Sequence, residues 1–164
     1  MEAHAWVSMV YYNYLENNSF EEGDRAWTFM DLAHADELYV EDKKTDSLTG
    51  TKHAHFWSAA RDSVEFTLEQ RVEALPAGRY SFSVSIMGGD AGDQEIYAYV
   101  KEGDEILASA PMSISAYGAW DTGLIPAFEH TEGAELTVGV YVRCQGAGSG
   151  AWGKIDDAKL NAVP

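Results

Sequence analysis

The stretch SVEFTLEQRV, residues 63–72, alternates apolar and polar side chains almost without interruption. Val64, Phe66 and Leu68 share one side of an extended chain, and polar residues share the other. A period of two is typical of a β-strand that buries one face. This stretch therefore predicts a half-buried strand, and it sets the pattern for the rest of the chain.

Other stretches repeat the same alternation with turn signals between them. They are YSFSVSI (80–86), EIYAYV (95–100), EILASA (105–110) and ELTVGVYV (135–142), and the turn signals are LPAGR (75–79), EGDE (102–105) and TEGAE (131–135). Helical spacing is nowhere sustained for the roughly ten residues that a helix needs. We therefore predict an all-β fold, an antiparallel β-sandwich of the jelly-roll type. A single domain of residues 1–164 is expected, with the sandwich over about 5–162.

The charge balance restricts the partners. The chain has 11 Lys and Arg against 27 Asp and Glu, a formal net charge of −16. Such a field repels phosphate backbones and anionic membrane surfaces, so neither nucleic acid nor a membrane is an expected partner. The single Cys144 cannot form an internal disulfide and is predicted to be an ordinary strand residue. The opening Met is interpreted as a start placed before a segment of a longer secreted protein.

Aromatic residues exceed what a core of this size needs. The chain has five Trp and nine Tyr, so some of the rings are expected at the surface for a reason. In a sandwich, strand positions next to inward-facing residues point outward. If Ile96 and Val140 point inward, then Tyr97, Tyr99 and Tyr141 point outward.

Several motifs follow one another in an order that carries a family resemblance. They are NNSFEEG…W (17–27), G-x-K-H-x-H-F-W-S (50–58), V-x-F-x-L-E-Q (64–70), L-P-A-G-x-Y (75–80), GGDAGD-x-x-I-Y-A-Y-V (88–100), YG-x-W (117–120), E-L-T-V-G-V (135–140) and GAWGKIDDAKL (150–160). This order resembles the galactan-binding modules of bacterial endo-β-1,4-galactanases, carbohydrate-binding module family 61, from about residue 15 to residue 161. The resemblance implies a non-catalytic module that binds β-1,4-galactan, tethers a covalently linked glycoside hydrolase to it outside the cell, and holds a structural Ca²⁺.

The acidic residues near the two ends are the candidates for that calcium site. Ca²⁺ takes carboxylate and backbone carbonyl oxygens. If the first and last strands lie side by side, Glu21 comes near Asp156 and Asp157, and the loop that ends at Lys52 can add a carbonyl. The alternative is that these carboxylates only cap turns and face solvent.

The sugar site is expected to combine flat rings with polar groups that bind hydroxyls. The predicted platform is Trp57, Trp120 and Trp152, together with Tyr97, Tyr99 and Tyr141. The alternative for each Trp is core packing, which is the interpretation for Trp27.

Three polar residues are the candidates for contacts with the sugar hydroxyls. They are Asp90, Gln94 and Arg143. Their alternatives are a turn contact for Asp90 and a surface ion pair for Arg143. His53 and His55 lack a third ligand of matching spacing for zinc, so they are predicted to be strand residues beside the site.

Two other functions stay open at this stage. A glycan-active enzyme needs two facing carboxylates, whereas the outward positions near the tyrosines are expected to carry Ser, Thr, Tyr and Arg. A spacer or adhesion domain would bind no sugar at all.

Overall fold

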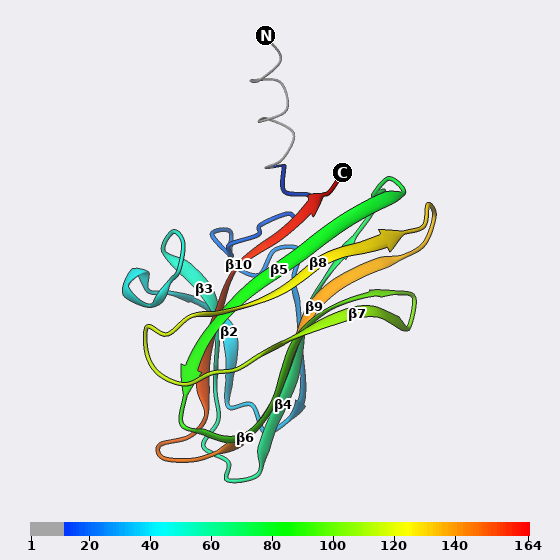
Figure 1. Ribbon diagram of the computed structural model, residues 1–164. Coiled ribbons are helices and arrows are strands. Elements are labelled where there is room, and N and C mark those ends of the chain that lie inside the picture. Colours follow the sequence, from blue (N-terminus) through cyan, green and yellow to red (C-terminus); the bar gives the residue numbers. More distant parts are fainter. Residues whose placement is uncertain (1–11) are drawn as a thin grey trace.

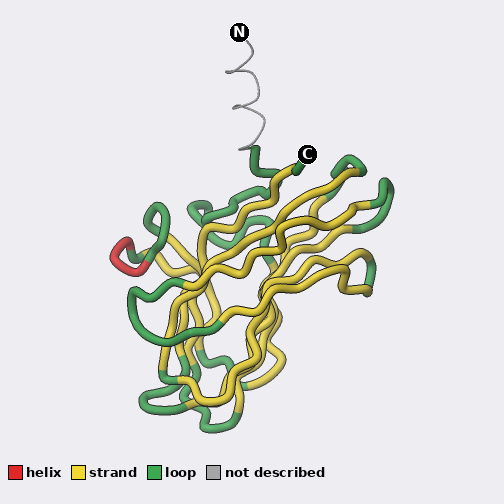
Figure 2. The backbone as a smooth tube through the Cα atoms, viewed as in Figure 1, coloured by secondary structure: helices red, strands yellow, loops and turns green. Residues whose placement is uncertain are grey.

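The computed structural model describes residues 12–164, and within that range it is built almost entirely of strands (Figures 1 and 2). The strands are β1 (Thr28–Ala33), β2 (Glu37–Asp42), β3 (Lys52–Trp57), β4 (Ser63–Val72), β5 (Gly78–Gly89), β6 (Ala91–Glu102), β7 (Glu105–Met112), β8 (Asp121–His130), β9 (Leu136–Gly146) and β10 (Trp152–Ala162). One short 3₁₀ turn, η2 (Lys44–Asp46), precedes β3. Positions 5–11 of the expected sandwich lie outside the described residues.

The strands form two five-stranded antiparallel sheets. The order is β1-β4-β9-β6-β7 in the first sheet and β2-β3-β10-β5-β8 in the second. The two sheets face each other across one apolar core, so the predicted antiparallel β-sandwich is confirmed. In the described part of the chain, no helix is long and apolar enough to span a bilayer.

The alternation read from the sequence matches the burial in the sandwich. Strand β4 covers residues 63–72, and its Val64, Phe66 and Leu68 are almost fully buried. Trp27 and Cys144 are also buried, as predicted, and the indole nitrogen of Trp27 donates to the carbonyl of Asn17 at 2.8 Å. Strands β5 and β6 are longer than the predicted stretches 80–86 and 95–100, because the GGDAGD segment forms a tight hairpin between them.

The two ends of the described chain lie side by side, as predicted. The backbone NH of Tyr14 donates to the carbonyl of Leu160 at 2.9 Å, and the NH of Ala158 donates to the carbonyl of Asn18 at 3.1 Å. In Figure 1 the described chain starts beside the C-terminus and runs away from it along β10. Strand β10 carries a bulge after Asp156, where its register with β5 shifts by one residue and Asp157 takes a φ of 58°.

Candidate functional site

Two of the predicted tryptophans meet on the outer face of the second sheet. Trp57 ends β3, Trp152 begins β10, and the two are register partners. They line a hollow of about 350 Å³ with four polar residues, Glu37, Asp46, His55 and Lys154. We call this hollow the tryptophan pocket. Alternation places these residues together, because His55 lies two positions before Trp57 and Lys154 lies two positions after Trp152.

A glycine makes room for one of the indoles. Gly89, at the end of β5, is the register partner of Trp152. A Cβ atom at Gly89 would lie 3.1 Å from the indole nitrogen of Trp152. The other indole is fixed by a hydrogen bond of 3.2 Å from Trp57 Nε1 to the carbonyl of Ser149. The pocket therefore has two aromatic walls whose positions are set by the backbone around them.

The floor of the pocket is a network of hydrogen bonds centred on Lys154. This residue is only 5% exposed, and its Nζ lies 2.6 Å from Glu41 Oε1 and 2.7 Å from His55 Nδ1. His55 Nε2 in turn lies 2.7 Å from Glu37 Oε1. An ammonium group can only donate, so His55 Nδ1 accepts and His55 Nε2 carries the proton that Glu37 accepts. The floor thus has a defined tautomer and fixed donor and acceptor directions.

The electrostatics of this floor favour its ionised carboxylate. Burial opposes the charge on Glu41, but hydrogen bonds from Lys154 and His53 outweigh it and hold the pKa of Glu41 below its ordinary value. Burial lowers the pKa of His53, which is fully buried with Nε2 on Glu41 and Nδ1 on Ser47. A buried charge that is paired in this way keeps a fixed geometry.

A loop ahead of β8 lies beside the pocket. The ring of Tyr117 lies 6.5 Å from that of Trp152, and its hydroxyl oxygen lies 2.9 Å from two acceptors, Asp46 Oδ1 and the carbonyl oxygen of Thr45. Gln94 holds the same loop through two hydrogen bonds with the backbone of Ile114. The loop is therefore held at two points, Ile114 and Tyr117.

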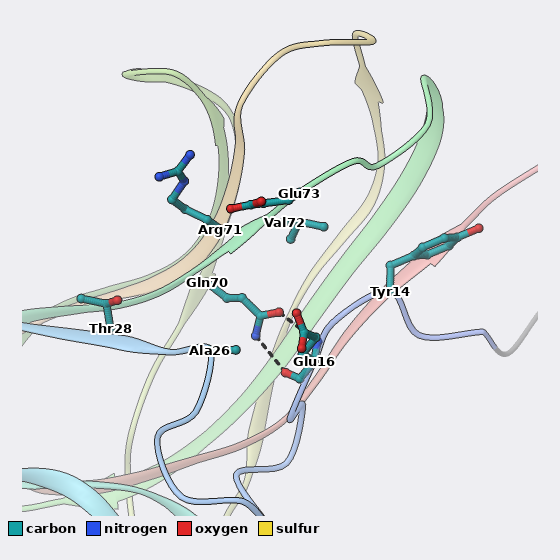
Figure 3. A pocket seen from close by; sticks show the side chains of 8 residues that line it. All are labelled: Tyr14, Glu16, Ala26, Thr28, Gln70, Arg71, Val72 and Glu73. Carbon is teal, nitrogen blue, oxygen red and sulfur yellow. Dashed lines mark hydrogen bonds between the residues drawn. The ribbon is translucent and has the colours of Figure 1, made fainter.

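A larger hollow of about 450 Å³ lies elsewhere and is less suited to a ligand (Figure 3). Two polar residues of its lining are bonded to each other: the side chain of Gln70 accepts from the NH of Glu16 and donates to the carbonyl of Glu16, both at 2.9 Å. Tyr14 is the one ring drawn along its lining in Figure 3. These contacts pin the N-terminal segment to β4, so we interpret this hollow as structural.

The other predicted sugar contacts are not brought into the tryptophan pocket. Trp120 lies in the loop that carries Tyr117 but does not line the pocket. Asp90 is exposed at the β5–β6 turn with a φ of 52°, and its carbonyl accepts from the NH of Ala147 at 2.8 Å. Gln94 is occupied by the backbone of Ile114.

The tyrosines and Arg143 lie on the opposite sheet. Tyr97 and Tyr141 stack there, and Arg143 Nε lies 3.5 Å from Glu95. Tyr99 lies on the same outward face as predicted, but it is only 4% exposed, because its ring lies over Gly139 and its hydroxyl donates to Glu69.

Glutamates flank these tyrosines, which corrects one expectation. Outward positions near the tyrosines were expected to carry no glutamates, but the pairing of β4 with β9 brings Glu65 and Glu69 of β4 to this face. Each accepts a hydrogen bond from a tyrosine hydroxyl. The sequence could not show this, because the pairing of the strands is a long-range property.

The residues predicted for calcium lie around one loop. Asp156 is fully buried, and its Oδ2 accepts from the NH groups of Leu48 and Thr49 at 3.0 and 2.9 Å. The carboxylate of Glu21 accepts from the NH of Lys52, next along the same loop, at 2.9 Å. Burial raises the pKa of Asp156 to about 6, although backbone hydrogen bonds oppose the shift.

These donors fit a calcium ion only in part. The carboxylate of Asp157 lies 3.4 Å from Lys159 Nζ, and the Nζ of Lys52 lies 3.4 Å from the carbonyl of Glu21. Among residues 12–164, no three His, Cys, Asp or Glu side chains cluster as metal ligands. Any site here would have to draw on backbone carbonyls for most of its six to eight oxygens.

Most of the polar lining of the pocket was missed from the sequence. His55 is predicted as a strand residue beside the site, but Glu37, Asp46 and Lys154 are not predicted there. For Lys154 the available signal was its spacing of two residues from Trp152 in WGK, which places both side chains on one face of β10.

Solved structures share this fold across nearly the whole chain. TmCBM61, solved in complex with β-1,4-galactotriose, is 26% identical with a TM-score of 0.77, and the match covers 93% of this chain and 99% of that one. The Clostridium thermocellum endo-1,4-β-D-xylanase 10B modules CBM22-1 and GH10, complexed with xylohexaose, are 14% identical with a TM-score of 0.64, covering 94% of this chain and 29% of that one. A family 16 carbohydrate-binding module is 15% identical with a TM-score of 0.57, covering 90% and 99%.

These matches confirm the predicted resemblance: the chain is a β-sandwich module like that of family 61. The two more distant structures support the fold alone. No protein-family model matches the sequence, and no curated protein does.

Proposed function

We propose that this chain is a non-catalytic carbohydrate-binding module that holds β-1,4-galactan in the tryptophan pocket. The observation that carries the proposal is the pairing of Trp57 with Trp152 above the Lys154 network. The likeness to TmCBM61, solved with β-1,4-galactotriose, supports the choice of sugar.

The pocket has groups that match both parts of a galactose ring. One face of the ring is a patch of C–H groups, which an indole covers, and its rim is a set of hydroxyls. Lys154 supplies a further donor, whereas Glu37 and Asp46 supply acceptors. Because these groups are already ordered by one another, binding costs little side-chain entropy.

The remaining predicted residues have supporting places in this proposal. Gln94 acts by holding the loop that carries Tyr117 against the pocket. Trp120 in that loop and Asp90 in the neighbouring turn stay predictions for contact with a longer chain.

The test is isothermal titration of the domain with β-1,4-galactotriose, with cellotriose and xylotriose as controls. We expect heat of binding for the galactoside, and a loss of affinity of at least about thirtyfold for Trp152→Ala, the size of a binding hot spot. Trp120→Ala is the matched control, because Trp120 lies outside the pocket lining. Unchanged affinity in both Trp57→Ala and Trp152→Ala would contradict the assignment of the pocket.

The finer parts of the proposal concern the parent protein. We propose a secreted bacterial galactanase that carries this module beside its catalytic domain, where tethering raises the local enzyme concentration. The xylanase neighbour supports this, because its structure contains a carbohydrate-binding module together with a GH10 module. The net charge of −16 supports the exclusion of nucleic acid and membrane partners. Release of reducing sugar from galactan by the isolated domain would contradict the non-catalytic assignment.

We further propose that a structural Ca²⁺ binds where the 48–52 loop meets the bulge of β10. The support is the fully buried carboxylate of Asp156, which faces the backbone of the 48–52 loop. Glu21, Lys52 through its carbonyl, and Asp157 are the other proposed ligands. We expect calcium to raise the melting temperature and EDTA to reverse the rise, with both effects lost in Asp156→Asn. Equal melting temperatures with and without calcium would refute this part alone.

A further inference from the structure

We propose that the outer face of the first sheet is a second glycan-binding surface, which takes a neutral β-1,4-linked polysaccharide chain. We call it the tyrosine face, and its central residues are Thr67, Tyr97, Tyr99, Lys101 and Tyr141. It lies on the sheet opposite the tryptophan pocket and does not depend on that pocket.

Stacked rings form the centre of this face. Tyr97 of β6 and Tyr141 of β9 are register partners, with ring centroids 5.0 Å apart and planes inclined by 28°. A hollow of about 200 Å³ lies against them. Gly139 deepens the face, because a Cβ atom there would lie 2.9 Å from Tyr99 Cζ. The ring of Tyr99 can therefore lie flat against the sheet beside the stacked pair.

Hydrogen bonds fix these rings in place. The hydroxyl of Tyr141 donates to Glu65 at 2.5 Å, and the hydroxyl of Tyr99 donates to Glu69. Lys101 Nζ lies 3.2 Å from the same Glu69. Rings that are already ordered lose little conformational freedom when a ligand covers them. The face is thus built as a rigid platform rather than as a flexible surface.

The shape of the face suits an extended chain. One row of register neighbours crosses all five strands of the sheet: Pro111, Tyr97, Tyr141, Thr67 and Met30. With neighbouring strands about 4.8 Å apart, this row spans about 19 Å. The row is mostly aromatic and apolar, and hydrogen-bonding groups run along both sides of it. A linear chain of pyranose rings presents the matching pattern, C–H faces along its length and hydroxyls at its edges.

The charge of the face disfavours an anionic occupant. Lys101 pairs with Glu69 at 3.2 Å, and Arg143 lies 3.5 Å from Glu95. Glu65, which accepts from the hydroxyl of Tyr141, and Asp104 add negative charge, so the face is acidic. The net charge of −16 repels anionic chains as well. A neutral polysaccharide is the occupant that needs no unpaired charge.

The test is a titration of the ¹⁵N-labelled domain followed by amide chemical shifts. The probes are the soluble hexaoses of β-1,4-galactose, β-1,4-xylose and β-1,4-mannose, each to about 10 mM, enough to detect a dissociation constant near 1 mM. Gly139 on β9 reports on the tyrosine face, and Gly153 on β10 reports on the tryptophan pocket. We expect at least one hexaose to shift Gly139 and its neighbours. Tyr97→Ala should weaken that response about tenfold, whereas Tyr97→Phe, which keeps the ring, should retain it.

The two reporters separate this inference from the proposed function. Shifts at Gly153 alone, with all three probes, would overturn the second surface and leave the tryptophan pocket in place. Shifts at Gly139 alone would support the tyrosine face and contradict the pocket. A Tyr97→Ala response equal to that of the unsubstituted domain, or concentration-dependent shifts at Gly139 without sugar, would assign the face to another use and overturn the proposal.

Discussion

Replacing Lys154 by methionine tests whether the floor of the tryptophan pocket is a paired buried network. Lys154 Nζ is shared by Glu41 at 2.6 Å and His55 at 2.7 Å, and Asp46 lies at 3.7 Å. Methionine keeps an apolar stem of similar length but leaves these groups without their ammonium partner. The substitution therefore removes one charge and leaves buried acceptors behind.

The cost can be worked out from the burial of the partners. Removing one member of a buried ion pair costs about 3–5 kcal/mol. The side chain of Lys154 is 6% exposed but that of Glu41 is 25% exposed, which favours the lower end. We expect the free energy of unfolding to fall by about 3 kcal/mol, a drop in melting temperature of about 6–12 °C for a domain of this size.

The assay is urea denaturation of the variant and of a matched control. Lys101→Met is the control, because Lys101 pairs with Glu69 at 3.2 Å near the surface, where both side chains are about a quarter exposed. That change should cost no more than about 1 kcal/mol. The double variant Lys154→Met with Glu41→Gln should recover about 1–2 kcal/mol, because it leaves no unpaired charge on Glu41. Equal losses for Lys154→Met and Lys101→Met would refute the reasoning.

Three further predictions follow from individual contacts. Gly89→Ala should push the indole of Trp152 by a few tenths of an ångström, since the new Cβ would lie 3.1 Å from its nitrogen. Galactotriose binding should weaken severalfold while the melting temperature stays nearly constant. Unchanged titration heats would contradict this prediction. Burial opposes ionisation of Asp46, but hydrogen bonds from Tyr117 and Lys43 hold its pKa below the ordinary value. The stabilising effect of the Asp46 carboxylate should therefore be full above the ordinary carboxyl pKa of about 4 and be lost as pH falls through the lower folded value. The difference in unfolding free energy between the unsubstituted domain and Asp46→Asn should shrink in acid. A difference that stays constant with pH would be inconsistent with this. Burial raises the pKa of Cys144 to about 11, so a thiol reagent should label it only in denaturant; rapid labelling of the native domain would count against its burial in β9.

The strands could be predicted from the sequence because their signal is local. Alternation placed strand β4 correctly, since Val64, Phe66 and Leu68 each bury the side chain that the period of two predicts. The sandwich followed from many such strands separated by turns. The low exposure of Tyr99 could not be predicted in this way. Alternation gives the face on which a ring lies, but not the glycine beside it that lets the ring lie flat.

The candidate site was only half predictable for a related reason. Trp57 and Trp152 could be singled out by residue type, but their meeting depends on β10 pairing with β3, strands almost a hundred residues apart. The same pairing brings His55 beside Lys154. Lys154 was not proposed from the sequence because a lysine next to an acidic pair is usually a surface residue. Only its burial shows that it organises the pocket.

A crystal structure of the domain with β-1,4-galactotriose tests the central claim most directly. The account predicts a galactose ring stacked on Trp57 or Trp152, with its hydroxyls in hydrogen-bond distance of Glu37, Asp46 or Lys154. An ordered trisaccharide found elsewhere, with the tryptophan pocket holding only solvent, would contradict it.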